Sequence, residues 1–246
     1  MQESGTSRSS RQVGSSQSAL WSPDGKRIVY RGTRQGTRNV YWKSADGTGE
    51  EERLTTKEGV IQTPTSISPD GRWLLFSDAG GETKSDIWML RLDGDRSPQP
   101  FLRTSASETN ARISPDGRWV AYVSDASGPN EVYVQSFPAQ GPRRQISTAG
   151  GIEPLWSRDG RELFYQSGDK LMVVDVVTSP TFSAGTPRVL FAGRYGISPT
   201  GITANSQSAD GRRFLRNQQV QPPQPLDSID VVLNWFEQLK QAAAQQ

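Results

Sequence analysis

A Ser-Pro-Asp-Gly tetrapeptide recurs along the chain at nearly constant spacing, and this repeat constrains the fold more than any other feature. Three copies are intact and two keep only Ser, Asp and Gly, with their first residues at Ser22, Ser68, Ser114, Ser157 and Ser208. The copies are 46, 46, 43 and 51 residues apart. Periods of about 20–50 residues are typical of solenoids and propellers, and this one matches the length of a four-stranded blade.

Each copy is surrounded by short runs of β-branched and aromatic residues, which read as strands. A residue or two before the tetrapeptide should end the first strand, and a basic residue followed by an apolar run begins the second. The second strands are expected at residues 27–30, 73–76, 119–122, 163–165 and 214–215, the third at 39–42, 86–90, 131–134, 171–174 and 229–233, and short fourth strands at 52–55, 99–102, 144–147 and 188–191.

The Asp-Gly pair of each copy predicts a tight turn between the first and second strands. Pro presets the entry dihedral, Asp can accept a hydrogen bond from the backbone two residues on, and Gly adopts the positive φ that closes the turn. All five copies keep Asp and Gly, whereas Pro is missing from the last two. Turn geometry is therefore the feature that the repeat maintains.

The repeat predicts an all-β chain, a β-propeller of four-stranded antiparallel blades with five repeats detected and a sixth possible if the chain is part of a longer propeller. We expect a tail at residues 1–10, one propeller domain at 11–236 and a second tail at 237–246. The segment 11–14, Arg-Gln-Val-Gly, is similar to the fourth-strand segment 144–147, Arg-Gln-Ile-Ser. It could complete the last blade and close the ring.

Composition excludes several kinds of chemistry. The chain has no Cys and no His, so it can contain neither a thiolate nucleophile nor a Ser-His-Asp triad nor a His-ligated metal. We therefore expect no enzyme activity, no metal and no cofactor. The 28 basic and 26 acidic residues leave a net charge of +2, which does not indicate nucleic-acid binding. No signal peptide and no apolar run of about 18 residues is found, so membrane insertion by this chain is not expected.

Three other features have a structural reading that we prefer to a functional one. Most aromatic residues recur at strand positions, which predicts packing between blades rather than a carbohydrate platform. If Trp73 is buried, Trp73→Ala should cost roughly 3–5 kcal/mol. The acidic run 50–52 reads as a solvated loop, and Asp-Gly-Asp at 93–95 lacks the further ligands of a calcium loop and reads as a turn.

The mouth of the central channel is the expected binding site, because the inner strands of a propeller line it. Counting back a few residues from each tetrapeptide gives the candidate ligand-binding residues Ser18, Thr65, Asn110, Arg112, Glu153 and Asn205. A water-filled channel without a dedicated ligand is one reading of this set. The other is a peptide or small polar ligand held by Asn110, Arg112 and Glu153.

With these residues in view, the repeat resembles the TolB-like, WD-like propeller family over residues 17–236. The segment 210–240, with its Pro-rich loop at 222–225, is similar to the end of the propellers fused to bacterial membrane-anchored Ser/Thr protein kinases. That resemblance implies a sensor or scaffold region, while the kinase motifs themselves are absent from this chain. It also favours a periplasmic or extracytoplasmic location, with any targeting element outside this sequence.

Two functions remain open at this point. The first is a non-catalytic, monomeric propeller that serves as a protein-interaction, scaffold or sensor module of a larger bacterial protein, with a protein or peptide as its partner. The second is a propeller that accompanies a hydrolase or peptidase domain not present in this chain. A free-standing lyase or glycosidase is disfavoured because the chain has no His.

Overall fold

The chain folds entirely into β-strands within the part that the computed structural model describes, which comprises residues 16–193, 205–208 and 213–216. The strands are β1 (Ser16–Trp21), β2 (Arg27–Arg34), β3 (Thr37–Ser44), β4 (Glu52–Arg53), β5 (Ile61–Ile67), β6 (Trp73–Ala79), β7 (Ser85–Arg91), β8 (Gln99–Leu102), β9 (Glu108–Ile113), β10 (Trp119–Ser124), β11 (Glu131–Ser136), β12 (Arg144–Gln145), β13 (Ile152–Trp156), β14 (Glu162–Ser167), β15 (Lys170–Val177), β16 (Ser183–Ala184), β17 (Arg188–Ala192), β18 (Asn205–Gln207) and β19 (Phe214–Arg216). The prediction of an all-β chain is confirmed for these residues.

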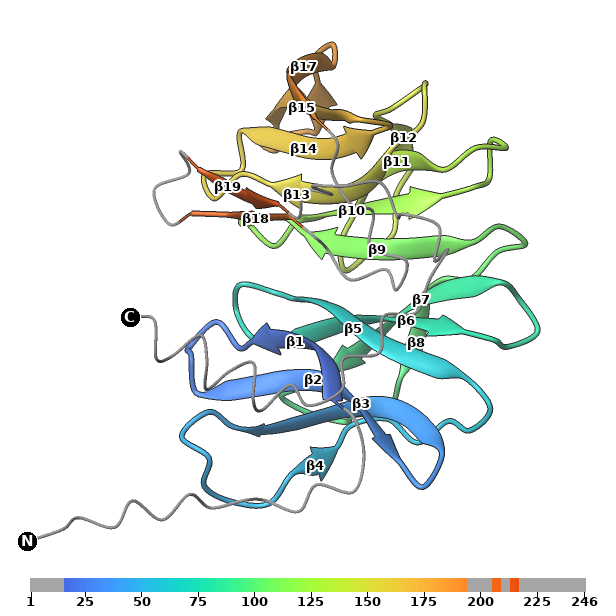
Figure 1. Cartoon of the computed structure of the whole chain (residues 1–246), viewed down its shortest axis with the longest axis vertical. Helices are drawn as coiled ribbons and strands as arrows, with labels where there is room; N and C mark the ends of the chain where they lie inside the picture. Colours follow the sequence, from blue (N-terminus) through green and yellow to red (C-terminus); the bar gives the residue numbers. More distant parts are fainter. Residues whose placement is uncertain (1–15, 194–204, 209–212, 217–246) are drawn as a thin grey trace, which may run out of the picture.

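Strands of one repeat pair antiparallel with each other, in chain order. Strands β1–β4, β5–β8 and β9–β12 form the first three units, and β13, β14, β15 and β17 form the fourth, with β16 paired to the far end of β15. Figure 1 shows β1 to β4 stacked outwards at the lower end of the molecule and β13 to β17 at the upper end. The first strands lie side by side in the order β1, β5, β9, β13 and β18, so they form the inner rim.

The repeated tetrapeptide forms the same hydrogen-bonded turn in the first four repeats. In the first, the Asp24 carboxylate accepts the Lys26 amide at 3.0 Å, and Gly25 has a φ of 69°. Ser22 Oγ donates to Asp24 at 2.6 Å and accepts the Arg27 amide at 2.9 Å. The roles of Asp and Gly are as predicted, whereas that of Ser is new: its hydroxyl ties the turn to the start of the second strand. The hydrogen bond that the Ser22 hydroxyl donates to the Asp24 carboxylate lowers the pKa of Asp24.

Apolar side chains fill the space between neighbouring units. One buried cluster lies between the first and second repeats, one between the second and third, and one between the third and fourth. Aromatic packing is confirmed for Trp42 and Trp156, which are buried. Trp73 is only half-buried, although its ring meets that of Phe137 edge-on at 6.1 Å, and Trp21 is 63% exposed. The burial assumed for Trp73→Ala is therefore not met, and its cost should fall below the predicted range.

Buried polar side chains also connect neighbouring units at the ends of the inner strands. Between the first two, Asn39 donates to Gln62 at 2.8 Å, and Gln62 donates to Asp78 at 3.0 Å. Glu108 occupies the position of Gln62 in the third repeat, six residues before the tetrapeptide. It is buried, its Oε2 atom has no hydrogen-bond partner among the described residues, and burial together with the nearby Asp86 raises its pKa.

Replacing Glu108 by glutamine, the residue of the second repeat, should stabilise the protein by about 1 kcal/mol at pH 7, because a neutral amide avoids the cost of a buried carboxylate oxygen without a hydrogen-bond partner. A carboxyl with a raised pKa in the folded state contributes its stability below the pKa of the unfolded state and loses it as pH rises through the folded value. The melting temperatures of wild type and Glu108→Gln should therefore be close at pH 4 and diverge towards pH 7. A constant difference across this range would contradict the assignment.

Ring closure and the number of blades stay predictions. Among the described residues, no strand pairing joins β18 or β19 to β1. The segments on which closure depends, 11–14 and 229–235, and the predicted tails 1–10 and 237–246 lie outside the described residues. Within the part described, no helix is long and apolar enough to cross a membrane.

Candidate functional site: the inner rim

The inner strands of the first four repeats each carry an irregularity of register at the same place. It falls between Gln17 and Leu20 in β1, between Pro64 and Ser66 in β5, opposite Ala121 and Val123 in β9, and between Ile152 and Leu155 in β13. Bulges of this kind redirect side chains and are enriched beside functional sites. The rim residues chosen from sequence thus lie on a distorted part of each strand.

Three of these bulges hold a residue other than glycine in the left-handed backbone region. Ser18, Asn110 and Glu153 have φ values of 57°, 54° and 53°, and each lies four residues before the serine of its tetrapeptide. The second repeat has Pro64 there, whose ring keeps φ near −65°. A left-handed non-glycine residue costs roughly 1–2 kcal/mol. Such strain gathers at binding and catalytic sites, which makes this set the candidate functional site.

Arg112 joins three adjacent inner strands. Its Nη1 atom donates to the Thr65 carbonyl of β5, and its own carbonyl accepts the indole N–H of Trp156 from β13 at 2.9 Å. Burial lowers the pKa of Arg112 to about 10, and the negative charge of Glu153 partly opposes that shift. The guanidinium therefore stays protonated at neutral pH. Its hydrogen bond to the Thr65 carbonyl connects the second and third inner strands.

The other predicted residues differ in how free they are to meet a ligand. Thr65 is buried and its hydroxyl donates to the Leu75 carbonyl at 3.1 Å, so this side chain forms a contact within the second repeat. Asn110 and Ser18 are half-buried, and the Ser18 hydroxyl oxygen has no hydrogen-bond partner among the described residues. Asn205 starts β18 opposite Arg216; its side chain lies outside the described part. Among the predicted residues, Ser18, Asn110 and Arg112 are thus half-buried, whereas Glu153 is buried like Thr65.

Two rim residues were missed by the sequence reasoning. Ser66 accepts the Ile113 amide at 3.0 Å and so joins β5 to β9, and Trp156 caps the Arg112 carbonyl. Ser66 lies two residues before its tetrapeptide, the offset of Arg112, so reading that offset in every repeat would have found it. No local signal marks Trp156, because its partner lies 44 residues away.

The two acidic motifs set aside from sequence have structural roles. Glu51 is half-buried and pairs with Arg34 at 2.8 Å, and Tyr30 also donates to it, so the reading of this segment as a solvated loop is wrong for Glu51. Asp93 accepts from Arg91 at 2.7 Å within a turn. Within the ranges described, no group of three or more Asp or Glu side chains is arranged to hold a metal ion.

Substitutions at Ser18 test the strain. Ser18→Gly should raise the free energy of unfolding by up to about 1 kcal/mol, because glycine adopts a left-handed backbone without steric cost. Ser18→Val should lower it by about 1–2 kcal/mol. The matched control is Ala19→Gly on the same strand, which should destabilise by about 0.5–1 kcal/mol. Equal effects of Ser18→Gly and Ala19→Gly in urea unfolding would contradict the strain.

Known structures share this fold. TolB from Acinetobacter baumannii is 24% identical, with a TM-score of 0.65 over 82% of this chain and 48% of that one. A putative TolB from Agrobacterium tumefaciens is 19% identical, with a TM-score of 0.58 over 70% of this chain and 64% of the other. A puromycin-hydrolyzing peptidase from Mycobacterium tuberculosis is 15% identical, with a TM-score of 0.56 over 75% of this chain and 32% of that one.

These similarities define the class of the molecule: it has the fold of a TolB-like β-propeller. The chain spans about half the length of the first of these structures and less than two thirds of the second. No protein-family model and no curated protein sequence matches the chain.

Proposed function

We propose that the chain is a non-catalytic interaction module, the scaffold or sensor propeller of a larger bacterial protein, whose inner rim binds a protein or peptide partner. The observation that carries the proposal is the strained rim: three inner strands hold Ser18, Asn110 and Glu153 in the same left-handed geometry. Backbone strain of this size at equivalent positions is expected where side chains are positioned for a ligand.

The rim chemistry favours a peptide. The half-buried Asn110 offers an amide donor and acceptor, the groups that pair with the N–H and C=O of a peptide, next to the charges of Arg112 and Glu153 that hold the rim. With neither His nor Cys in the chain, the usual general base and the thiolate nucleophile are both missing. Binding without turnover is the function that fits.

The role of a kinase-linked sensor rests on the resemblance of residues 210–240 to the ends of kinase propellers, and that segment is largely outside the described residues. We propose this sensor role as the specific form of the function, for a monomeric protein in an extracytoplasmic location. The alternative, a propeller accompanying a hydrolase, is favoured by one observation: a peptidase is among the structures with this fold.

Selection of random twelve-residue peptides displayed on phage against the purified chain tests the proposal. Peptides that bind wild type should bind Asn110→Gly at least tenfold more weakly, because glycine keeps the left-handed backbone and removes only the side chain. The matched control is Asn130→Ala, at an exposed asparagine in the loop between β10 and β11. If the selected peptides bind wild type, Asn110→Gly and Asn130→Ala equally, the inner rim is not their binding site. Turnover of peptide or polysaccharide substrates by the purified chain would exclude a non-catalytic role.

A further inference from the structure

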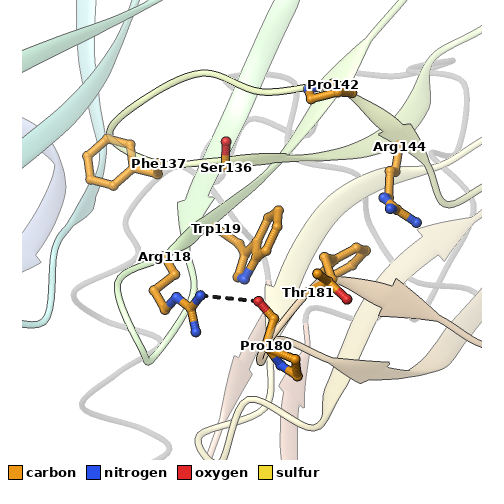
Figure 2. A pocket seen from close by; sticks show the side chains of 9 residues that line it. Arg118, Trp119, Ser136, Phe137, Pro142, Arg144, Pro180 and Thr181 are labelled. Atoms are coloured by element: carbon orange, nitrogen blue, oxygen red, sulfur yellow. Dashed lines mark hydrogen bonds between the residues drawn. The ribbon is translucent and has the colours of Figure 1, made fainter.

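A second candidate site lies away from the inner rim, on the face that carries the tetrapeptide turns. It is a pocket of about 400 Å³ between the third and fourth repeats, which we call the arginine pocket; Arg118, Trp119, Pro142, Arg144, Pro180 and Phe182 are among its lining residues. Pockets of roughly 300–1,000 Å³ are typical of ligand sites. In Figure 2 the ring of Trp119 lies between Arg118 on one side and Arg144 on the other.

The floor of the pocket is aromatic and rigid. The rings of Trp119 and the buried Phe182 lie 5.1 Å apart, and the indole N–H of Trp119 donates to the Thr178 carbonyl at 2.9 Å. The indole is therefore held in place with its polar atom satisfied, while the residue remains half-exposed. The exposed Pro142 and Pro180 extend the apolar surface at opposite edges.

The residues that line the pocket carry an unbalanced charge; the tetrapeptide's Asp116, which is not among them, accepts the Arg118 backbone amide at 3.1 Å. No acidic residue lines it. None of the ion pairs found in the described ranges includes Arg118 or Arg144. Among the described residues, the Arg118 guanidinium makes one hydrogen bond, and it is a long one, 3.4 Å to the Pro180 carbonyl. Both guanidinium groups are exposed and lie beside an apolar floor.

The second repeat has an acidic residue next to the arginine that is equivalent to Arg118. The Leu92 amide donates to the Arg72 carbonyl at 2.7 Å, and the Phe137 amide donates to the Arg118 carbonyl at 2.8 Å, so these two pairs occupy equivalent places. The residue after Leu92 is Asp93, which lies 3.5 Å from Arg72, whereas the residue after Phe137 is a proline. Arg118 therefore lacks the acid that Arg72 has in Asp93, although it keeps Asp116 at the position of Asp70.

Two other pockets on the same face confirm the contrast within the described part of the chain. The one between the first and second repeats is lined by Asp24, Asp70 and Asp93 besides its basic residues. The one at the fourth repeat is lined by Asp159, Glu162 and Asp175. Both carry their own counter-charges, and the arginine pocket does not.

We propose that the arginine pocket binds an acidic peptide segment of a partner protein, with Asp or Glu side chains on Arg118 and Arg144 and an adjacent Pro or aromatic residue on Trp119. Guanidinium groups bind carboxylates through paired, charge-assisted hydrogen bonds, and indole faces pack against proline and aromatic rings. The site is separate from the inner rim and does not depend on the function proposed for it.

An array of fluorescein-labelled eight-residue peptides tests this proposal by fluorescence anisotropy. Each peptide combines Asp or Glu with Pro and one aromatic residue, and a matched array carries Asn and Gln in place of the acids. Wild type should bind members of the acidic array and not their amide counterparts, and binding should weaken as salt rises. Absence of binding to the acidic array, or equal binding to both arrays, would overturn the proposal.

Two double variants with the same change in net charge locate the site. Arg118→Gln/Arg144→Gln should weaken binding about tenfold or more, the loss expected for charge-assisted contacts. Arg72→Gln/Arg143→Gln should change it less than twofold, because the exposed Arg72 pairs with acids of its own repeat and the Arg143 guanidinium lies over Tyr133. A thermal melt checks that both variants fold.

Equal weakening by the two double variants would show attraction to net charge alone and would overturn the proposal. Asn110→Gly should leave binding unchanged, because it lies on the rim. If the peptides instead lose affinity for Asn110→Gly and keep it for Arg118→Gln/Arg144→Gln, the arginine pocket is rejected while the function proposed for the rim stands.

Discussion

Replacing Arg112 by methionine is expected to lower the free energy of unfolding by about 3 kcal/mol, because the buried carboxylate of Glu153 would lose the positive charge that attracts it. Glu153 is only 3% exposed and attracts Arg112. The substitution also removes the donor that satisfies the Thr65 carbonyl across the neighbouring inner strand. The hydrogen bond from Trp156 should remain, because its acceptor is the backbone carbonyl of residue 112.

Urea unfolding of Arg112→Met, Glu153→Gln and the double variant measures this coupling. The double variant should be more stable than Arg112→Met alone, since a neutral amide at position 153 no longer needs a cation. Arg158→Met, at an exposed arginine, is the control and should stay within about 0.5 kcal/mol of wild type. A change below about 1 kcal/mol for Arg112→Met, or additive effects in the cycle, would contradict the bridging role.

If Arg112 stabilises the rim in this way, its variants are unsuitable for testing peptide binding. Loss of peptide binding in such a variant could result from disruption of the rim structure and not from the loss of a ligand contact. Asn110→Gly is the cleaner probe, because Asn110 is half-buried and glycine tolerates the backbone it leaves behind.

Truncating Phe76 to alanine should destabilise the protein by about 3–5 kcal/mol, the cost of emptying a fully buried aromatic site. Phe76 has no exposed surface and belongs to the cluster between the first two repeats. Trp73, on the same strand, is half-buried, and Trp21 is 63% exposed. The expected order of cost is therefore Phe76→Ala, then Trp73→Ala, then Trp21→Ala, with the last within about 0.5 kcal/mol of wild type.

Chemical unfolding followed by circular dichroism measures all three variants without relying on tryptophan fluorescence. If Trp73→Ala cost as much as Phe76→Ala, the half-exposed placement of Trp73 would be wrong. A large effect of Trp21→Ala would mean that residues outside the described part of the chain cover that side chain.

For the first four repeats, the sequence alone was enough to predict the strand order and the turns, because their interactions are local. The turn hydrogen bonds of Ser22 join residues two and five positions apart, and the glycine that follows Asp24 has the positive φ expected of it. Strand pairs within a unit are joined by short connections, so runs of β-branched and aromatic residues next to each tetrapeptide were sufficient to locate them. The offset from each tetrapeptide also identified Ser18, Asn110 and Glu153 as equivalent.

Tertiary structure decided what these equivalent positions do. The left-handed backbone of Ser18 and Glu153 has no signal in residue type, because neither serine nor glutamate favours that region. The bridge from Arg112 to Thr65 spans 47 residues and depends on how two units pack. The unbalanced charge of Arg118 likewise follows from which side chains the neighbouring loops bring near it. Local hydrogen bonds thus determine each unit from its own sequence, whereas burial and charge balance depend on contacts between units that only the folded chain brings together.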